Sequence, residues 1–274
     1  MNYLIYNDQF IAENNFVISP YNRAFCYGDG LFETMLFRDG KLLFLDDHLK
    51  RLTEGLVQLD IKLPKSLTKE TILKNVVELK DKNNLHQNAR IKIQVWRKQG
   101  GLITPETTEA EYTILASPYN KAVETKEKVF TSEGLSLNYT PLSKYKTLNV
   151  LPYLLAGIEK KKRSADEILL TDTKGNIAEA CSSNVFWSKS DTLYTPSLET
   201  GCIEGIMRKQ IIRFCHSENI KVVEGLYPIQ DLFSAELIFT SNITGLSLLE
   251  NINNKKINTE YTLYQAIRIG LDLL

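Results

Sequence analysis

The sequence has no excess of charge of either sign. Lys plus Arg and Asp plus Glu each number 33 among the 274 residues, so the formal net charge is zero. Proteins that bind nucleic acids usually present a basic surface, and this balance argues against a nucleic-acid partner. Apolar residues make up 43% of the chain, enough for a sizeable core in one large domain or two ordinary ones.

Cysteine and histidine are also scarce. The four cysteines show no Cys-x-x-Cys pair and no regular spacing, and the three histidines are scattered. We therefore expect reduced thiols in a cytoplasmic protein, and no metal site. The residues concerned are Cys26, Cys181, Cys202, Cys215, His48, His86 and His216.

Long hydrophobic runs are absent as well. No apolar run in the sequence approaches the roughly 18 residues of a membrane span. Residues 1–10 lack the basic-then-apolar pattern of a signal peptide. The sequence therefore predicts a protein without a membrane partner.

The first 117 residues predict a mixed α+β domain with mainly antiparallel strands. Asp39-Gly40 lies between apolar runs and indicates a hairpin, and Asp46 or Asp47 is a candidate helix cap. Leucines recur at helical spacing after this point, and clean alternation marks a later strand. The expected segments are a helix after Asp47, a second helix over 68–82, and strands over 89–96 and 111–117.

After Ser117, a Pro-Tyr-Asn segment and a charged run to Lys128 indicate a linker, which divides the chain into domains 1–117 and 118–274. In the second domain, Lys146 is expected to open a helix that ends near Arg163. The other predicted segments are strands over 167–171 and 177–180 joined by a turn at 172–176, a helix over 206–216, a strand and loop over 236–245, a turn at 251–256, and a final helix over 261–274.

Several residues have an ordinary explanation when taken singly. Tyr27-Gly28-Asp29-Gly30 suits a hairpin corner, because two glycines allow a tight bend or a close backbone approach. Arg51 and Glu179 could each be solvated charges. Lys144 and Lys146 are both candidates for a reactive amine, and their local chemistry does not separate them.

The order of these motifs is more specific than any one of them. Tyr-Gly-Asp-Gly-Leu-Phe-Glu-Thr, His-Leu-Lys-Arg-Leu, Lys-Thr-Leu-Asn, Ile-Ala-Glu-Ala-Cys-Ser-Ser-Asn and Gly-Ile-Met-Arg follow one another along the chain. This series, from Tyr21 to about Leu248, resembles the fold-type IV pyridoxal-phosphate enzymes, the class IV aminotransferase family. The resemblance implies a mixed α+β and α/β fold of two domains: a small N-terminal α/β domain and a larger C-terminal domain with a barrel-like sheet.

The resemblance also implies a cofactor, a partner and a set of site residues. The cofactor is pyridoxal 5'-phosphate, the substrate is a small-molecule amine, and a homodimer is expected, with the Tyr27–Gly30 region near its interface. Lys146 is selected as the catalytic lysine. The implied cofactor-binding residues are Arg51, Lys146, Glu179, Ser183, Asn184, Gly205, Ile206, Met207, Asn242 and Ile243, and the implied substrate-binding residues are Tyr27, Phe32, Thr34 and Arg97.

Physical chemistry accounts for the main roles in that set. A guanidinium fork suits a phosphate group, and free N–H groups at a helix start can bind one. A carboxylate beside a pyridine nitrogen keeps that nitrogen protonated. Two positions depart from the family pattern: Met207 stands where a threonine is usual, and Asn242-Ile243 replaces Gly-Thr or Ser-Thr. Ser241 and Thr244 are candidate substitutes for the lost phosphate contact.

Within the family, the motifs favour 4-amino-4-deoxychorismate lyase, which eliminates pyruvate to give 4-aminobenzoate in the folate pathway. The supporting features are Lys146-Thr-Leu-Asn, the Phe186-Trp187 pair, Gly-Ile-Met-Arg and the Asn242 loop. Branched-chain aminotransferase is the alternative. The sequence disfavours D-amino-acid aminotransferase, since it has Phe32 in place of a tyrosine and no Arg-x-His.

Two further points concern the substrate carboxylates and the possibility of a non-catalytic relative. The carboxylates of the lyase substrate have no obvious partner, and Arg97 and Lys98 are the candidates. A relative that has lost catalysis is disfavoured because Lys146, Glu179 and Arg51 are all present.

Overall fold

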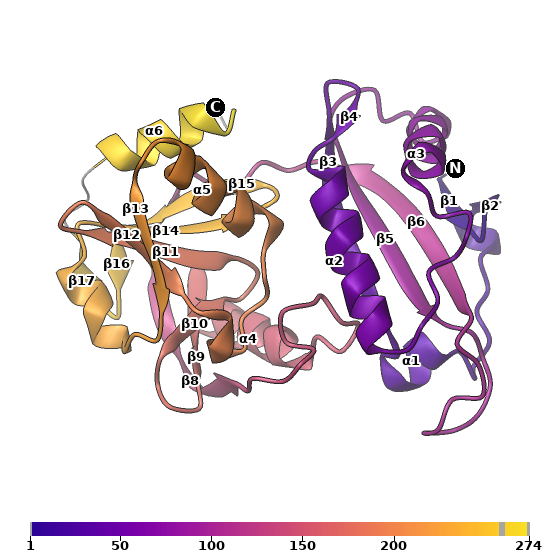
Figure 1. Cartoon of the computed structure of the whole chain (residues 1–274), viewed down its shortest axis with the longest axis horizontal. Helices are drawn as coiled ribbons and strands as arrows, with labels where there is room; N and C mark the ends of the chain where they lie inside the picture. The colour runs from indigo at the N-terminus through magenta and orange to yellow at the C-terminus, as the bar shows by residue number, and fades with distance from the viewer. Residues whose placement is uncertain (1, 258–260, 273–274) are drawn as a thin grey trace. The chain divides into compact units, whose positions relative to one another are not determined.

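The chain folds into two compact units, shown in a computed structural model that describes residues 2–257 and 261–272 (Figure 1). The first unit comprises the chain up to Asn120 together with Tyr145–Asn149. The second comprises Lys121–Lys144 and the chain from Val150 onward. The predicted boundary after residue 117 did not foresee that Tyr145–Asn149 would return to the first unit.

An antiparallel sheet of six strands forms the frame of the first unit, in the order β2-β1-β6-β5-β3-β4. Its strands are β1 (Tyr3–Tyr6), β2 (Gln9–Ala12), β3 (Gly30–Arg38), β4 (Lys41–Leu42), β5 (Ala89–Arg97) and β6 (Ala110–Pro118). The predicted hairpin at Asp39-Gly40 joins β3 to β4, and the two predicted later strands are present with the antiparallel pairing expected.

Two long helices cover one face of this sheet (Figure 1). The helices of the unit are α1 (Arg23–Tyr27), α2 (Leu45–Gln58) and α3 (Lys69–Lys82). Leu52 and Leu56 of α2 are buried, as the leucine spacing predicted. The predicted cap of α2 was wrong. The N-cap residue is Phe44, and Asp46 and Asp47 lie in the first turn, where carboxylates stabilise the positive end of the helix dipole.

The second unit contains two sheets around a shared core. One has the order β10-β9-β8-β16-β17 and the other β13-β12-β11-β14-β15-β7. Buried residues from both sheets, among them Leu169, Val185 and Ile238, belong to one apolar cluster, which gives the half-barrel form that the resemblance implied. The strands are β7 (Thr125–Lys126), β8 (Val129–Leu137), β9 (Glu167–Asp172), β10 (Ile177–Ala180), β11 (Asn184–Lys189), β12 (Thr192–Pro196), β13 (Lys221–Gly225), β14 (Leu237–Asn242), β15 (Gly245–Leu249), β16 (Asn251–Ile252) and β17 (Lys255–Lys256).

Three helices pack on these sheets: α4 (Leu151–Lys162), α5 (Ile206–Ser217) and α6 (Thr262–Gly270). The predicted start of α5 is confirmed, with Gly205 as its N-cap residue, and the helix ends one residue later than predicted. The final helix is shorter than predicted, and positions 273–274 of that prediction lie outside the described residues. No helix of the described part of the chain is long and apolar enough to span a membrane.

Lys146 does not open a helix, which corrects the prediction. Residues 145–149 run alongside β3 instead: the Phe32 N–H donates to the Lys146 carbonyl at 2.8 Å, and the Leu148 N–H donates to the Gly30 carbonyl at 2.9 Å. Helix α4 begins only at Leu151, and Pro152 stands in its first turn, where a missing N–H costs nothing. Bonding to the sheet edge therefore replaces helical bonding in this stretch.

The two positions of the Gly-Asp-Gly motif require glycine for different physical reasons. Gly28 ends α1 in the left-handed region at φ +64°, which glycine adopts without strain. Gly30 lies in β3 against the backbone of β5, where a Cβ atom would come within 2.4 Å of the Val95 carbonyl oxygen. The predicted tight bend and the predicted close approach are thus both present, at successive glycines.

Gly30→Ala should destabilise the protein by about 2–4 kcal/mol, because the added methyl group meets backbone that cannot rotate away. Urea denaturation of the two proteins measures this. Gly157→Ala is the matched control: its Cβ would lie 3.9 Å from the Cys181 sulfur, and alanine favours a helix interior by roughly 1 kcal/mol. An equal loss of stability in both variants would contradict the steric argument.

Candidate active site

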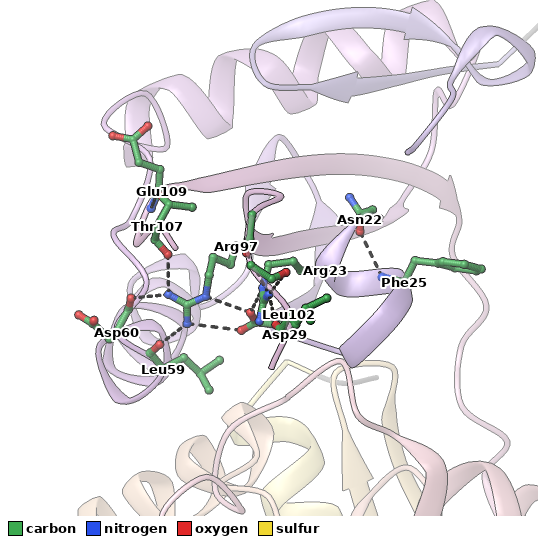
Figure 2. A network of polar contacts seen from close by, with 12 residues as sticks. Asn22, Arg23, Phe25, Asp29, Leu59, Asp60, Arg97, Leu102, Thr107 and Glu109 are labelled. Carbon is green, nitrogen blue, oxygen red and sulfur yellow. Dashed lines mark hydrogen bonds and ion pairs between the residues drawn. The ribbon is translucent and has the colours of Figure 1, made fainter. Parts of the chain in front are cut away.

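Asp29, between the two glycines, holds two buried arginines in the first unit. Its carboxylate accepts hydrogen bonds from Arg23 Nε at 2.7 Å and from Arg97 Nε at 2.9 Å. Figure 2 shows the Arg97 guanidinium reaching Asp29 on one side and the carbonyls of Leu59 and Asp60 on the other. With a further bond to the Thr107 carbonyl and a longer one to Asp29, all five N–H donors of Arg97 have acceptors.

Arg97 is therefore a structural residue, and its predicted role in binding a substrate carboxylate does not agree with the structure. Its guanidinium joins β5 to the end of α2, and the residue is only 4% exposed. Lys98, the other candidate, is partly exposed and pairs with Glu109 at 3.1 Å. The neighbouring Arg23 donates to the carbonyls of Gly100, Gly101 and Leu102, so it fixes the loop after β5 (Figure 2).

Lys146 lies over the ring of Phe32. Its Nζ is 4.6 Å from the ring centroid, within the range of a cation–π contact. The backbone bonds between residues 146–148 and β3 hold the lysine at this position. Lys144 belongs to the other unit, where its carbonyl accepts the Glu204 N–H at 3.0 Å. The two lysines that local chemistry left equivalent thus have different surroundings.

A second lysine approaches the same phenyl ring, and the sequence analysis missed it. Lys92 on β5 stands directly across from Thr34 on β3, and its Nζ lies 5.0 Å from the Phe32 ring centroid. Burial, and then the charge of Arg90, lower the pKa of Lys92. No hydrogen bond or ion pair joins the Lys92 side chain to another described residue. A half-buried cation of this kind suits an anionic ligand.

The signal for Lys92 was available in the sequence. Strand 89–97 alternates, and its polar positions face the same side as Phe32 and Thr34 in the observed register. The register itself depends on which strand pairs with which, and local patterning does not give that pairing. Tyr27, the remaining substrate-side prediction, is partly exposed at the end of α1, with the Arg23 guanidinium 4.9 Å from its ring centroid.

Arg51 forms a buried cluster with Glu33 and His48. Its Nε and Nη2 donate to the two oxygens of Glu33 at 2.8 and 2.6 Å, and His48 Nδ1 lies 2.7 Å from the same carboxylate. Burial alone raises the pKa of Glu33, but the charge of Arg51, together with the His48 contact, outweighs burial and lowers that pKa to about 2. Arg51 is thus a buried, oriented guanidinium rather than a solvated charge.

In the second unit, Glu179 on β10 is 3% exposed and accepts several hydrogen bonds. The Tyr153 hydroxyl donates to Oε1 at 2.6 Å, and the Ile203 N–H donates to the same oxygen at 3.1 Å. The Asn184 amide approaches Oε2 at 3.4 Å. Hydrogen bonds of this type stabilise the ionised form of a buried carboxyl group. The strand glutamate is therefore a fixed, buried carboxylate.

Asn184 links Glu179 to the start of α5. Its amide donates to the Ile203 carbonyl at 2.8 Å. A Cβ atom on Gly205 would lie 1.9 Å from Asn184 Oδ1, so a larger residue here would displace the Asn184 side chain. No side chain caps α5 at Gly205, while Ile206 and Met207 are buried in its first turn. The N–H groups of such a turn form a site for an anion.

The turn after β14 lies beside this helix start. Ser241 pairs with Asn184 across β14 and β11, so the two side chains share a face. Ser241 Oγ is buried and has no hydrogen-bond partner in the described structure. Asn242 donates to Ser183 Oγ at 3.0 Å and accepts from the Thr244 N–H and hydroxyl. Of the two proposed substitutes, Ser241 thus has an unused hydroxyl, whereas Thr244 stabilises the turn together with Asn242 and the intervening Ile243.

These residues fit the cofactor that the sequence resemblance implied. A pyridoxal phosphate molecule needs an acceptor for its ring N–H, donors for its phosphate and an amine for its aldehyde. Glu179 would be the acceptor, and the Ser241 hydroxyl, buried without a partner in the described structure beside a helix start that no side chain caps, would donate to the phosphate. Among the described residues, no cluster of three or more His, Cys, Asp or Glu is arranged to hold a metal ion.

Comparisons with known proteins agree on the family of this chain. Residues 30–247 match the model of the family described as amino-transferase class IV. The chain is 30% identical to a putative branched-chain-amino-acid aminotransferase of Methanocaldococcus jannaschii, over 93% of this chain and 89% of that protein. It is also 30% identical to the aminodeoxychorismate lyase of Bacillus subtilis, over 92% and 85%.

The fold is shared with solved structures of the same group. The branched-chain aminotransferase of the thermophilic archaeon Thermoproteus uzoniensis, solved with norvaline, superposes with a TM-score of 0.89 at 20% identity. The match covers 99% of this chain and 94% of that one. At this level of identity the comparison shows the fold-type IV architecture.

The Glu33 cluster predicts an acid-sensitive stability. The folded pKa of Glu33, about 2, lies below its ordinary value of 4.5. Its contribution of about 3 kcal/mol is therefore full above pH 4.5 and is lost as the pH falls toward 2. Glu33→Gln should destabilise the protein at neutral pH by roughly 3–5 kcal/mol, because the buried Arg51 guanidinium loses the charged carboxylate that its Nε and Nη2 contact.

Urea denaturation of both proteins at several pH values tests this expectation. The difference between wild type and Glu33→Gln should shrink below pH 4.5. Glu109→Gln, which removes the partner of an exposed pair, is the control and should change stability by about 0.5 kcal/mol or less. A difference that stays constant with pH would show that Glu33 is not ionised in the folded protein.

Proposed function

Because the chain belongs to the class IV aminotransferase family, we propose that it is a pyridoxal-phosphate-dependent enzyme acting on the amine of a small carboxylate substrate. The proposed reaction is that of 4-amino-4-deoxychorismate lyase. In this reaction the C–O bond to the pyruvate group breaks after loss of a ring proton, and 4-aminobenzoate and pyruvate are formed.

Different residues of the chain would have different roles in this reaction. When bound, the cofactor draws electrons from the substrate carbon that carries the amine, so that negative charge there is stabilised. Glu179 would hold the proton of the ring nitrogen, and the α5 start with Ser241 would hold the phosphate. Arg51 of the first unit is the phosphate-binding arginine that the family resemblance implies. Lys146 would bind the cofactor aldehyde and, once the substrate amine has replaced it, accept the proton from the substrate carbon.

Lys92 is the observation that carries the lyase assignment. The lyase substrate has two carboxylates, and its leaving group departs as the enolate of pyruvate, which then takes up a proton to give pyruvate. Lys92 is a half-buried cation across from Thr34, on the same Phe32 ring as Lys146. A cation at this place would bind a substrate carboxylate and stabilise the departing charge. The apolar side chain of a branched-chain amino acid offers it no such partner.

Branched-chain aminotransferase is the second candidate, supported by the similarity to the Methanocaldococcus jannaschii protein. In that reaction Lys92 would meet the second carboxylate of an acceptor such as 2-oxoglutarate, and Lys146 would return the proton to the cofactor side. Since Lys146, Glu179 and Arg51 serve both reactions, the assignment depends on the substrate side of the site.

A direct assay with both kinds of substrate decides between these reactions. We expect pyruvate and 4-aminobenzoate from aminodeoxychorismate, with slow or no transfer from branched-chain amino acids to 2-oxoglutarate. Rapid transamination with no pyruvate formed would overturn the lyase assignment. Lys92→Met should raise KM for aminodeoxychorismate about ten- to a hundredfold, the value of a charged hydrogen bond. Lys98→Met, whose amine pairs with Glu109, is the control and should leave KM within about twofold.

The covalent bond to the cofactor provides a separate test. The purified protein should be yellow with bound cofactor, and borohydride should fix the cofactor to Lys146. Lys146→Ala should lose this adduct and activity, whereas Lys144→Ala should keep both. A reducible adduct that survives in Lys146→Ala would transfer the role to another lysine. A protein that never binds the cofactor would be the non-catalytic relative.

The family resemblance also supports a homodimer as the working form. A mass of one chain by light scattering, with activity retained, would contradict it. A cytoplasmic location is proposed from the cysteines, which are all free thiols in the structure. Recovery of the protein outside the cytoplasmic fraction would contradict that proposal.

A further inference from the structure

Tyr153 of helix α4 contacts the buried Glu179 carboxylate of the second unit. It stands in the first turn of α4, where its ring packs against the apolar cluster that contains Ile168, Leu170 and Ala178. Its hydroxyl donates to Glu179 Oε1 at 2.6 Å. A phenylalanine would fill the same apolar space, so the hydroxyl and its bond are what the tyrosine adds.

The hydroxyl is a permanent donor. Burial raises the pKa of the Tyr153 hydroxyl, and the charge of Glu179 raises it further. The proton therefore stays on the phenol at neutral pH, and the bond there is phenol to carboxylate. A hydrogen bond of this kind is charge-assisted and short, which is consistent with 2.6 Å.

The Tyr153 hydroxyl makes the shortest of the contacts described for the Glu179 carboxylate. Oε1 receives both Tyr153 at 2.6 Å and the Ile203 N–H at 3.1 Å. The Asn184 amide approaches Oε2 at 3.4 Å, which is a weak contact. The carboxylate is thus held firmly from the α4 side through its Oε1 atom.

We propose that Tyr153 is a positioning residue that holds Glu179 by Oε1 and weakens the pull of its carboxylate on the proton of the cofactor ring nitrogen. The inference rests on the proposed function, since it needs a ring nitrogen beside Glu179. A carboxylate that accepts a strong hydrogen bond is a weaker base. Removal of the Tyr153 hydroxyl then makes Glu179 more basic and holds the ring nitrogen more fully protonated.

Nitrogen NMR of the loaded protein measures this effect directly, without reference to turnover. Wild type and Tyr153→Phe are loaded with pyridoxal phosphate carrying ¹⁵N in the ring, and the ring signal is followed with pH. In Tyr153→Phe the signal should move toward that of a protonated ring nitrogen, and its titration midpoint should rise by about one pH unit. A purely structural role for Tyr153 predicts no such shift.

A fluorinated tyrosine incorporated at position 153 keeps every contact and serves where Tyr153→Phe folds poorly. Its more acidic phenol is a stronger donor, so the ring signal should move in the opposite direction. Tyr6→Phe is the matched control, because it removes another phenol-to-carboxylate bond, to Glu111 at 2.8 Å in the first unit. The ring signal should be unchanged in that variant.

The outcomes separate the inference from the proposed function. A wild-type ring signal that is protonated and responds to Glu179→Gln, but not to either change at Tyr153, overturns the inference alone. A protein that does not bind the labelled cofactor, or a ring signal that ignores Glu179→Gln, overturns the proposed function and the inference with it. Opposite shifts in Tyr153→Phe and the fluorinated variant support both.

Discussion

Two backbone hydrogen bonds between residues 146–148 and β3 fix where the Lys146 amine, the proposed reactive group, lies. They join the Phe32 N–H to the Lys146 carbonyl and the Leu148 N–H to the Gly30 carbonyl. Because these bonds belong to a sheet edge, the lysine is placed by backbone geometry rather than by a flexible loop. Phe32, Thr34 and Lys92 then share the side of the sheet on which the Lys146 amine lies.

Arg23 and Arg97 differ from Lys92 in how their charge is used within the first unit. Arg23 and Arg97 have their donors directed to Asp29 and to backbone carbonyls. Such groups stabilise a loop and a helix end, and Arg97, whose five donors all have acceptors, has none left for a ligand. Lys92 is half-buried without a carboxylate partner among the residues that the structure describes, and it is the kind of cation that a ligand can pair with.

The second unit shows the same distinction among polar groups. Asn242 and Thr244 stabilise their turn through each other, whereas Ser241 Oγ is buried without a partner in the described chain. Glu179 is oriented by Tyr153, Asn184 and the Ile203 N–H, which come from three separate segments. A carboxylate held in this way keeps its direction when a cofactor binds or leaves, because its neighbours rather than the ligand define its position.

The sequence alone determined the family, the order of the elements and most of the candidate site. Hydrophobic periodicity and glycine positions are local properties, and the ordered motifs around Gly28, Arg51, Lys146, Glu179 and Gly205 are specific as a set. Only the tertiary structure decided which of the charged residues were already paired. Arg97 and Lys92 lie five positions apart on one strand. Asp29, the end of α2 and the loop after β5 supply an acceptor for every donor of Arg97, whereas the Lys92 side chain, across from Thr34, has no acceptor among the described residues. The bond from Tyr153 to Glu179 likewise joins residues 26 positions apart, and such long-range pairing depends on packing that local patterning does not encode.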